Sequence, residues 1–316
     1  MQQLKLDKLK LELPLSVVKE ENENVCSITA TKDSSTFKLH YTQKTPYYLQ
    51  IIVDDVEKTL TIEFTGKILG KDYPKLITRE TIRECFEVIN SVGAITLDID
   101  KALKYAKVLL ADITCDCEIG DIKEFVTYIN GNLKSNRMYN SRVLKNGNYI
   151  LEKNVTSDRS KLRLTIYDKD KELHHSNNNA FNTYTHNELL EAFKGKTRFE
   201  MNIKSQEQLK KVLHITNTSL WSVLNSEVTP IRAFLDDVIA ADDDMPILKE
   251  MRTYQQMLVL KECGYDIKQV ENKIREHYNH PNVSKLIKPY RALLNERHNL
   301  PSEKAFKQQL LSKVEG

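Results

Sequence analysis

The chain has 316 residues, of which 40% are hydrophobic and 29% charged, so it can bury two or three modest cores. No stretch approaches the run of about 20 apolar residues that crosses a bilayer. Residues 1–14 alternate Lys with Leu instead of forming the apolar block of a signal peptide, and we expect a cytoplasmic protein. Five cysteines without CxxC spacing argue against a disulfide framework and a structural zinc site.

The net charge of +3 does not by itself indicate a nucleic-acid partner, but its distribution is uneven. Residues 132–172 contain 10 Lys or Arg against 5 Asp or Glu, and residues 245–316 contain 13 against 8, so each segment carries +5. Two basic segments are compatible with contacts to a DNA backbone. Solvated helices and loops explain them equally well.

The amino-terminal part, to about residue 66, has the pattern of strands and turns. Leu9, Leu11 and Leu13 alternate with polar residues, and alternation returns in TFKLHYT, YYLQIIVD and TLTIEF. From Thr78, a plausible N-cap, apolar residues take helical spacing as far as Gly93, a natural stop.

The middle of the chain alternates helical and strand patterns. Residues 101–110 read as a short helix or an approach strand, 119–131 as a helix, and 132–148 as a hairpin or loop leading to a strand at 149–151. A helix with Thr185 at its cap follows a polar connection. From about residue 206 the pattern is helical to the end, and the acidic segment 240–246 is the best candidate linker.

Three segments alternate strictly between apolar and polar residues, so each predicts a half-buried strand. Cys115 and Cys117 fall on the apolar side of the first, where thiols behave as small hydrophobes. If the three strands share a sheet, one face is core and the other gathers carboxylates, cations and a tyrosine. The polar sets are Asp112, Thr114, Asp116 and Glu118; Arg163, Thr165, Tyr167 and Lys169; and Arg198, Glu200, Asn202 and Lys204.

Carboxylates that share a strand face repel one another, and either solvent or a divalent cation relieves the repulsion. Mg²⁺ and Mn²⁺ prefer such oxygen ligands, which makes Asp112, Asp116 and Glu200 candidate metal ligands. A solvated edge strand is the alternative. A bound phosphate also needs cations, which Arg163, Lys169 and Arg198 can supply; Lys169 and Arg198 would stabilise charge in the reaction.

Tyr167 is the candidate nucleophile, because Asp168 and Lys169 follow it directly. A phenol that attacks a phosphodiester keeps the bond energy as a phosphotyrosine, so the strand can be rejoined without ATP. A packing role is the usual alternative for a strand tyrosine, and Tyr149 and Tyr184 are reserves. The chain lacks a His-hydrophobic-His triplet, and we interpret His174 and His175 as polar loop residues near DNA.

Four stretches together resemble the replication initiation proteins of the phage and plasmid gene II/X family and the related Rep_trans rolling-circle initiators. They are IEFTGKILGKDY, LLADITCDCEIGD, SDRSKLRLTIYDKDKEL and TRFEMNIKSQEQL, with a later match at KLIKPYRALL. We expect Mg²⁺ or Mn²⁺ at the carboxylates and origin DNA that is single-stranded or a hairpin; the resemblance implies a site-specific endonuclease and strand transferase, which nicks the origin and stays on the 5′ phosphate. Host helicase and polymerase are the further partners it implies.

The resemblance also implies roles for individual residues. Asp112 and Asp116 resemble the paired aspartates of the family's acidic strand, and Arg198 with Glu200 resembles its R-x-E motif. The tyrosine-acidic-lysine motif is matched by Tyr167, Asp168, Lys169 and Glu172. The chain departs from the Rep_trans pattern at Leu110, where an arginine often stands, and at Lys171, where some members have a second tyrosine.

The predicted fold class is α+β: antiparallel sheets with helices on one face, a core like that of nicking endonucleases, and a helical carboxy-terminal region. We expect a β-rich part at 1–95, a catalytic core at 96–225 and a helical DNA-binding region at 226–316. Arg163, Lys285, Lys288 and Arg291 are the candidate DNA contacts. A non-catalytic DNA-binding replication regulator and a mobilisation relaxase are the alternative functions.

Overall fold

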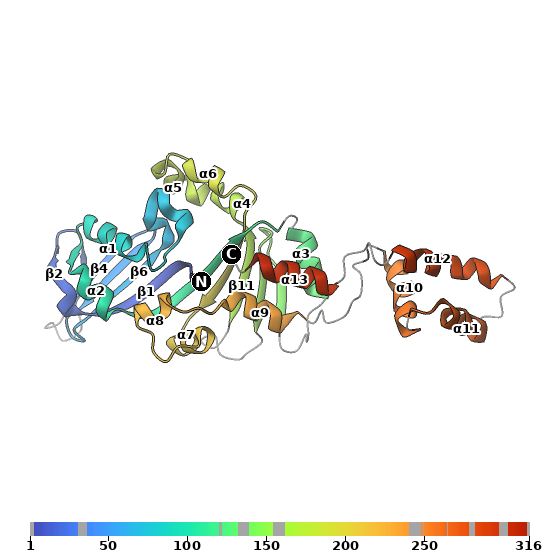
Figure 1. Ribbon diagram of the computed structural model, residues 1–316. Coiled ribbons are helices and arrows are strands. Elements are labelled where there is room, and N and C mark those ends of the chain that lie inside the picture. The colour runs from blue at the N-terminus through green and yellow to red at the C-terminus, as the bar shows by residue number, and fades with distance from the viewer. Residues whose placement is uncertain are drawn as a thin grey trace. The chain divides into compact units, whose positions relative to one another are not determined.

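The computed structural model describes residues 3–30, 37–119, 122–131, 139–153, 162–239, 248, 250–263, 265–277, 282–296 and 303–314 (Figure 1). The chain forms two compact units: Met1–Ile239 with Ser312–Gly316, and Ala240–Leu311. Among the described residues, no helix is both long and apolar enough to cross a bilayer.

One ten-stranded antiparallel sheet is the centre of the first unit, so the predicted α+β class is confirmed. Its strand order is β3-β4-β5-β6-β1-β8-β12-β11-β10-β9. A separate pair consists of β2 (Val18–Glu21) and β7 (Ile95–Leu97). The strands of the large sheet are β1 (Leu6–Pro14), β3 (Ser27–Ala30), β4 (Phe37–Gln43), β5 (Leu49–Asp54), β6 (Thr59–Thr65), β8 (Lys107–Cys117), β9 (Tyr139–Val143), β10 (Tyr149–Lys153), β11 (Arg163–Asp168) and β12 (Thr197–Ile203).

The sheet consists of two halves with the same strand order. In the first half-sheet, β1 is followed outward by β6, β5, β4 and β3; in the second, β8 is followed outward by β12, β11, β10 and β9. In each half-sheet, the strand that comes first along the chain therefore lies beside the strand that comes last, β1 beside β6 and β8 beside β12. The two halves meet where β1 pairs antiparallel with β8.

The compact units differ from the three predicted parts. The expected boundary at residue 95 falls between β6 and β8 in the chain. Both strands hydrogen-bond to β1 in the same sheet, so residues 1–95 and 96–225 form one unit. Helix α9 (Pro230–Val238), which the sequence assigns to the last part, also belongs to this unit. The second unit starts at residue 240, where the predicted linker 240–246 begins; that segment lies outside the described residues.

One face of the sheet is apolar because alternate residues point to it. Leu9, Leu11 and Leu13 are buried beside Phe64, Ile62 and Leu60 of β6, and Cys115 and Cys117 are buried as predicted. Helix α9 contacts β8 and β12. Full burial of a Leu, Ile or Phe side chain contributes roughly 1.5–3 kcal/mol, so this face stabilises the first unit.

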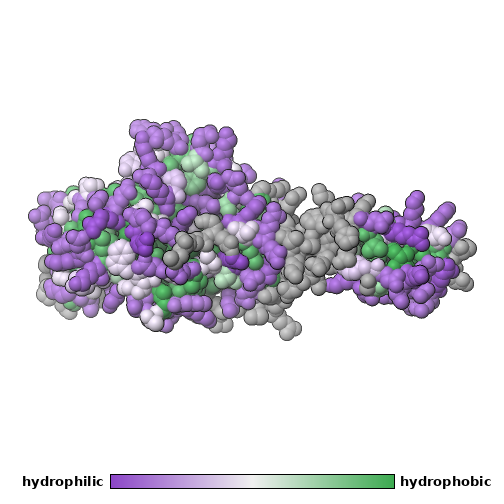
Figure 2. All heavy atoms as spheres, in the orientation of Figure 1, coloured by the Kyte–Doolittle hydropathy of each residue, from purple (hydrophilic) through white to green (hydrophobic). Residues whose placement is uncertain are grey.

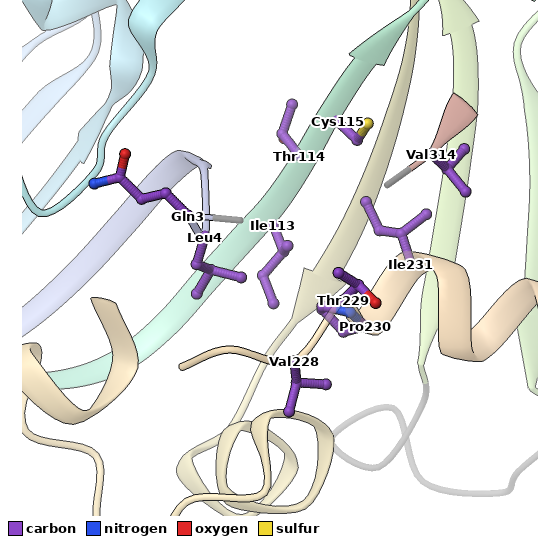
Figure 3. Close-up of a pocket in the computed structure, with 10 residues that line it drawn as sticks. All are labelled: Gln3, Leu4, Ile113, Thr114, Cys115, Val228, Thr229, Pro230, Ile231 and Val314. Atoms are coloured by element: carbon purple, nitrogen blue, oxygen red, sulfur yellow. The ribbon is translucent and has the colours of Figure 1, made fainter. Parts of the chain in front are cut away.

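Helices α1, α2, α3, α7 and α8 complete the helical layer of this unit. α2 contacts β1, α7 and α8 contact β8, and Phe125 of α3 packs edge-on against Phe199 of β12. A small pocket of about 40 Å³ remains between Cys115, Ile231 and Val314, room for only a few water molecules (Figure 3). The helices are α1 (Ile82–Ser91), α2 (Ile99–Tyr105), α3 (Ile122–Gly131), α7 (Gln206–Leu213) and α8 (Leu220–Leu224).

One predicted helix start is confirmed and one lies elsewhere. Thr78 caps the first turn before α1, because its Oγ1 accepts from the N–H of Thr81 at 3.3 Å and its carbonyl oxygen accepts from the N–H of Ile82 at 3.0 Å, while Oγ1 of Thr81 accepts from the N–H of Thr78. Thr185 does not cap the helix Glu188–Ala192 (α6), because its hydroxyl donates to the carbonyl oxygen of Phe181 at 3.1 Å and Thr185 ends the preceding helix, α5 (Asn179–Tyr184). Residues 101–110, predicted as a helix or an approach strand, contain both, since α2 ends at Tyr105 and β8 begins at Lys107.

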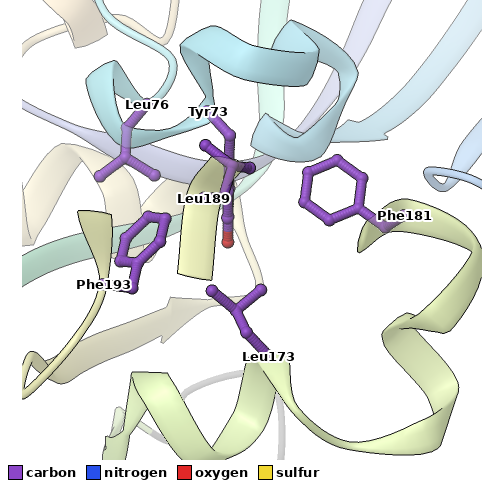
Figure 4. Packing of buried hydrophobic residues seen from close by; sticks show 6 residues of the cluster. All are labelled: Tyr73, Leu76, Leu173, Phe181, Leu189 and Phe193. Atoms are coloured by element: carbon purple, nitrogen blue, oxygen red, sulfur yellow. The ribbon is translucent and has the colours of Figure 1, made fainter. Parts of the chain in front are cut away.

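Two chain segments pack together over part of the polar face, and we call residues 66–77 and 169–196 the cover. Its elements are η2 (Gly66–Lys75), α4 (Lys169–Leu173), η3 (Ser176–Asn178), α5 (Asn179–Tyr184) and α6 (Glu188–Ala192). Figure 4 shows the buried cluster that joins them, with the Tyr73 hydroxyl pointing between its neighbours. The cluster is Tyr73, Leu76, Leu173, Phe181, Leu189 and Phe193.

The second unit is helical, with α10 (Met251–Glu262), α11 (Ile267–His277) and α12 (Val283–Glu296). Met257, Leu260, Val270 and Leu293 form its buried cluster, and Figure 2 shows hydrophobic side chains gathered between hydrophilic ones there. The unit boundary falls within α13 (Glu303–Lys313).

Candidate functional site

Strands β8, β12 and β11 are neighbours, and their polar residues lie in register on one face. Arg198 of β12 is opposite Asp116 of β8 and Tyr167 of β11, and Asn202 is opposite Asp112. The three segments selected from the sequence by alternation therefore lie side by side. Two groups of side chains form on this face, one around Arg198 and one around Glu200.

The first group is a buried ion-pair network around Arg198, whose side chain is 0% exposed. Its Nε and Nη2 donate to the two carboxylate oxygens of Asp116 at 2.7 and 2.6 Å. Nη1 donates to the Tyr73 hydroxyl at 2.6 Å and lies 3.0 Å from Oδ2 of Asp7. Burial opposes the charge of Arg198, but Tyr73, Asp7 and Asp116 raise its pKa well above the usual value.

This network changes two of the sequence-based assignments. Arg198 was a candidate phosphate ligand and Asp116 a candidate metal ligand, but their charges are satisfied by each other. Removing one partner of such a buried pair costs about 3–5 kcal/mol, because the other charge is left uncompensated. Arg198 and Asp116 therefore join β8, β12, β1 and the cover, and they are not oriented toward an incoming phosphate.

Asp7 is a site residue that the sequence analysis did not select. It lies in β1 at a β-bulge, where the register with β8 shifts between Leu6 and Lys8. Burial disfavours its ionised form, but the charges of Arg198 and Lys169 lower its pKa below the usual value. A sequence signal exists: the alternation of Leu4 and Leu6 changes phase before Leu9, as a bulge requires.

A glycine makes room for this carboxylate. A Cβ added to Gly66 would lie 3.3 Å from Oδ1 of Asp7 and 3.3 Å from the Tyr73 ring. Any larger residue there would push against both groups. Gly66 therefore allows η2 to approach β1 closely.

The second group links a phenol to two carboxylates. The Tyr167 hydroxyl donates to Oε2 of Glu200 at 3.0 Å. Nδ2 of Asn202 donates to Oε1 of Glu200 at 3.1 Å and to Oδ1 of Asp112 at 2.9 Å. Oε1 of Glu200 and Oδ1 of Asp112 therefore accept hydrogen bonds from the same amide nitrogen and lie close to each other.

Both carboxylates bind protons more tightly than usual. Burial, and then the charge of Glu200, raises the pKa of Asp112 to about 7. Burial and the charge of Asp7 raise the pKa of Glu200. Burial, and then Glu200, raises the pKa of Tyr167 well above its usual value, so the phenol keeps its proton unless a base removes it. Strong shifts gathered at one place are typical of functional sites.

Lys169 supplies a buried cation beside this group. Its side chain is 1% exposed, and its Nζ donates to Oε2 of Glu172 at 2.6 Å. The ammonium lies 5.8 Å from the centre of the Tyr167 ring and 5.1 Å from that of Tyr73. Burial, and then the charge of Arg198, lowers the pKa of Lys169 to about 8.

Other residues selected from the sequence lie apart from this group. Arg163 is half-buried, and its Nε lies 3.0 Å from Oε2 of Glu152. Tyr149 is buried and donates to Oδ1 of Asn130 at 2.8 Å. Tyr184 is 49% exposed on α5. The remaining ones are exposed, His174 and His175 after α4 and Lys285, Lys288 and Arg291 on α12 of the second unit.

The predicted metal ligands are only partly brought together. In the part of the chain that the structure describes, no group of three or more His, Cys, Asp or Glu side chains is arranged to hold a metal ion. Asp116 is engaged by Arg198, whereas Asp112 and Glu200 share one amide donor and have raised pKa values. Two carboxylates of this kind fit Mg²⁺, which often takes one or two carboxylates and completes its shell with water and phosphate oxygens.

No family model, curated protein or solved structure matches this chain. The likeness to replication initiators stays a prediction from the sequence stretches that suggested it.

Proposed function

We propose that the chain is a DNA nicking and closing enzyme that starts rolling-circle replication, acting in the cytoplasm on origin DNA as a single strand or hairpin. The observation that carries the proposal is the hydrogen bond from the Tyr167 hydroxyl to Glu200, a carboxylate whose pKa is raised. Such a pair is a nucleophile with a base in hydrogen-bonding reach. A host helicase and polymerase would act on the opened strand.

In the proposed reaction, Glu200 takes the phenolic proton as the Tyr167 oxygen attacks the phosphorus. The bond from phosphorus to the 3′ oxygen breaks, the 3′ oxygen takes a proton from solvent water, and a 5′-phosphotyrosine remains. Lys169 stabilises the phenolate through its positive charge, and Asn202 orients both carboxylates. Asp112 and Glu200 would hold a divalent ion, which supplies positive charge beside the phosphate.

Closing is the reverse of this step. A 3′ hydroxyl attacks the phosphorus and loses its proton to solvent water, the bond from phosphorus to the Tyr167 oxygen breaks, and Glu200 returns its proton to that oxygen. Microscopic reversibility gives Glu200 both roles, and a carboxyl group with a raised pKa suits both directions.

A DNA-binding regulator without catalysis is the second candidate. The observation in its favour is that Tyr167 is only 8% exposed and that Arg198 is fully engaged inside the protein. Such a protein would bind DNA in a salt-dependent way without cutting it. A mobilisation relaxase would share the chemistry and differ in the process served.

The test is nicking of supercoiled plasmid that carries the DNA flanking the coding region, in the presence of Mg²⁺. The expected result is open circles with covalently attached protein, abolished by Tyr167→Phe. Tyr139→Phe is the matched control, because it also removes the hydroxyl of a buried tyrosine in the same sheet, on strand β9, and that hydroxyl donates to Asp237 at 2.6 Å.

Three results separate the candidates. DNA binding without nicking would favour the regulator. Covalent attachment that persists in Tyr167→Phe would assign the nucleophile elsewhere, with exposed Tyr184 as the next residue to change. Nicking unaffected by Asp112→Ala would remove Asp112 from the site.

A further inference from the structure

A polar pocket of about 880 Å³ lies at the strand ends of the second half-sheet. This volume is in the range of about 300–1,000 Å³ that is typical of ligand pockets. Five short segments contribute its wall, and we call it the asparagine pocket. They are Ile122, Lys123, Val126 and Asn130; Val143, Asn146, Gly147 and Asn148; Asp168, Lys171 and Glu172; His175, Asn177 and Asn178; and Gly195, Lys196 and Thr197.

The wall combines neutral amides with basic groups. Five asparagines line it, together with three lysines and a histidine, against only two carboxylates, those of Asp168 and Glu172. Asparagine amides donate and accept hydrogen bonds, as the edges of nucleobases do, and lysines attract phosphates. The composition therefore fits a ligand that carries both bases and phosphates.

Two of the amides are held in place by the protein. Oδ1 of Asn130 accepts from Ser141 and Tyr149, both at 2.8 Å, while its Nδ2 has no hydrogen-bond partner among the described residues. Asn178 accepts from Lys67 and donates to Glu172. The fixed amide of Asn130 recognises a ligand without first losing side-chain freedom, whereas the amide of Asn178 is engaged inside the protein and only shapes the wall.

The pocket wall begins next to the candidate nucleophile. Asp168 directly follows Tyr167, and it pairs across the strands with Thr197, which directly precedes Arg198. Consecutive side chains of a strand point to opposite faces, so the Tyr167 hydroxyl does not share the face of Asp168, and the link to the pocket is Lys169, whose Nζ lies 5.8 Å from the centre of the Tyr167 ring. Glu172 also connects the two places, because it lines the pocket and bonds to Lys169.

We propose that the asparagine pocket binds a short single-stranded nucleic-acid segment beside the bond that Tyr167 attacks, an inference that rests on the proposed function. Unpaired bases can turn outward and present their hydrogen-bonding edges, whereas a duplex keeps those edges paired. The pocket thus selects single-stranded substrate and fixes the position of the reacting phosphate.

The first test compares two double variants by the anisotropy of labelled oligothymidine at increasing KCl. Lys123→Ala with Lys196→Ala removes two wall cations, and Lys104→Ala with Lys194→Ala removes two exposed lysines outside the wall. Loss of two phosphate contacts should lower the slope of log affinity against log salt by roughly 1.4, with about tenfold weaker binding at low salt. Equal behaviour of the two double variants would overturn the proposal.

Asn177→Asp is a second variant that guards against misfolding, since it adds a negative charge at an exposed position without changing size. It should weaken oligothymidine binding at least threefold while circular dichroism stays unchanged. Unchanged binding by this folded variant would count against the pocket.

The second test is photocrosslinking of an oligonucleotide that carries 4-thiothymidine, followed by peptide mapping. Crosslinks in residues 122–130 or 143–148 support the pocket, and crosslinks confined elsewhere overturn it. Crosslinking there without any Tyr167 adduct would refute the nuclease and retain the pocket. A Tyr167 adduct with unaltered binding by the pocket variants would support the nuclease and refute the pocket.

Discussion

The two half-sheets share a strand order but treat equivalent carboxylates in opposite ways. Glu63 lies on β6, beside the first strand of its half, and Lys8 and Lys10 reach it at 2.5 and 3.2 Å. Glu200 lies on β12, the corresponding strand, and its neighbours are a phenol, an amide and other carboxylates.

The pKa shifts follow from these partners. Burial favours the protonated form of both residues, but Lys8 and Lys10 outweigh it and lower the pKa of Glu63. For Glu200, burial and Asp7 act in the same direction and raise the pKa. In the first half-sheet, two lysines thus neutralise the charge of Glu63. In the second, Glu200 is a group that a proton, a metal ion or a substrate would stabilise. That difference locates the candidate chemistry in the second half.

The largest expected effect is on catalysis. Glu200→Gln keeps the shape but removes the base, so the nicking rate should fall about 10²–10⁴-fold. Glu63→Gln, the matched change in the first half-sheet, should leave the rate within about twofold. Plasmid nicking at saturating DNA measures both, and equal losses would mean that the comparison does not locate the active site.

The next effect is on stability. Arg198→Met leaves Asp7 and Asp116 buried without their cation, and the free energy of unfolding should drop by about 3–5 kcal/mol. Lys10→Met in the first half-sheet should cost at most about 1 kcal/mol, because its ion pair is partly exposed. Urea unfolding measures both; similar small costs would show that the Arg198 network does not hold the halves together.

A third prediction concerns pH. Because the pKa of Asp112 is raised to about 7, the stability from its bound proton is complete below about pH 4 and is lost as the pH rises through 7. Asp112→Asn should therefore unfold less readily than the parent at pH 8, by up to roughly 4 kcal/mol, and should match it at pH 4.

Glu63 in the first half-sheet is the control, because its pKa is shifted in the opposite direction. The pKa of Glu63 is lowered, so its stabilisation is present above the usual carboxyl range and is lost as the pH falls. Glu63→Gln should reduce stability at pH 8 by at most about 1 kcal/mol and less at pH 4. Thermal unfolding across pH 4–8 checks both variants, and a shared sign would contradict the assigned pKa directions.

The smallest expected effect belongs to the second unit. Exchanging Lys285, Lys288 and Arg291 for Ala should leave the unfolding of the sheet unchanged and lower the salt slope of duplex binding by about 2.7. A titration of duplex DNA at several KCl concentrations measures this slope. No change would restrict DNA contacts to the first unit.

Local patterns predicted much of the sheet. β1, β4, β5, β6, β8, β11 and β12 appear as alternating segments, and the alternation also indicates that Tyr167 and Glu200 face the same way as Asp112. The partners of Arg198 could not be predicted. Tyr73 lies 125 positions away in sequence, and Asp7 stands at a bulge whose register only the folded pairing sets.

The sequence by itself determined which residues face the core and which face away, because side-chain direction in a strand depends only on its two-residue period. Tertiary structure alone decided which charges meet. In the folded sheet, Asp116 pairs with Arg198, whereas Asp112 lies beside Glu200. The strength of an ion pair depends on distance and burial, which strand order and register establish.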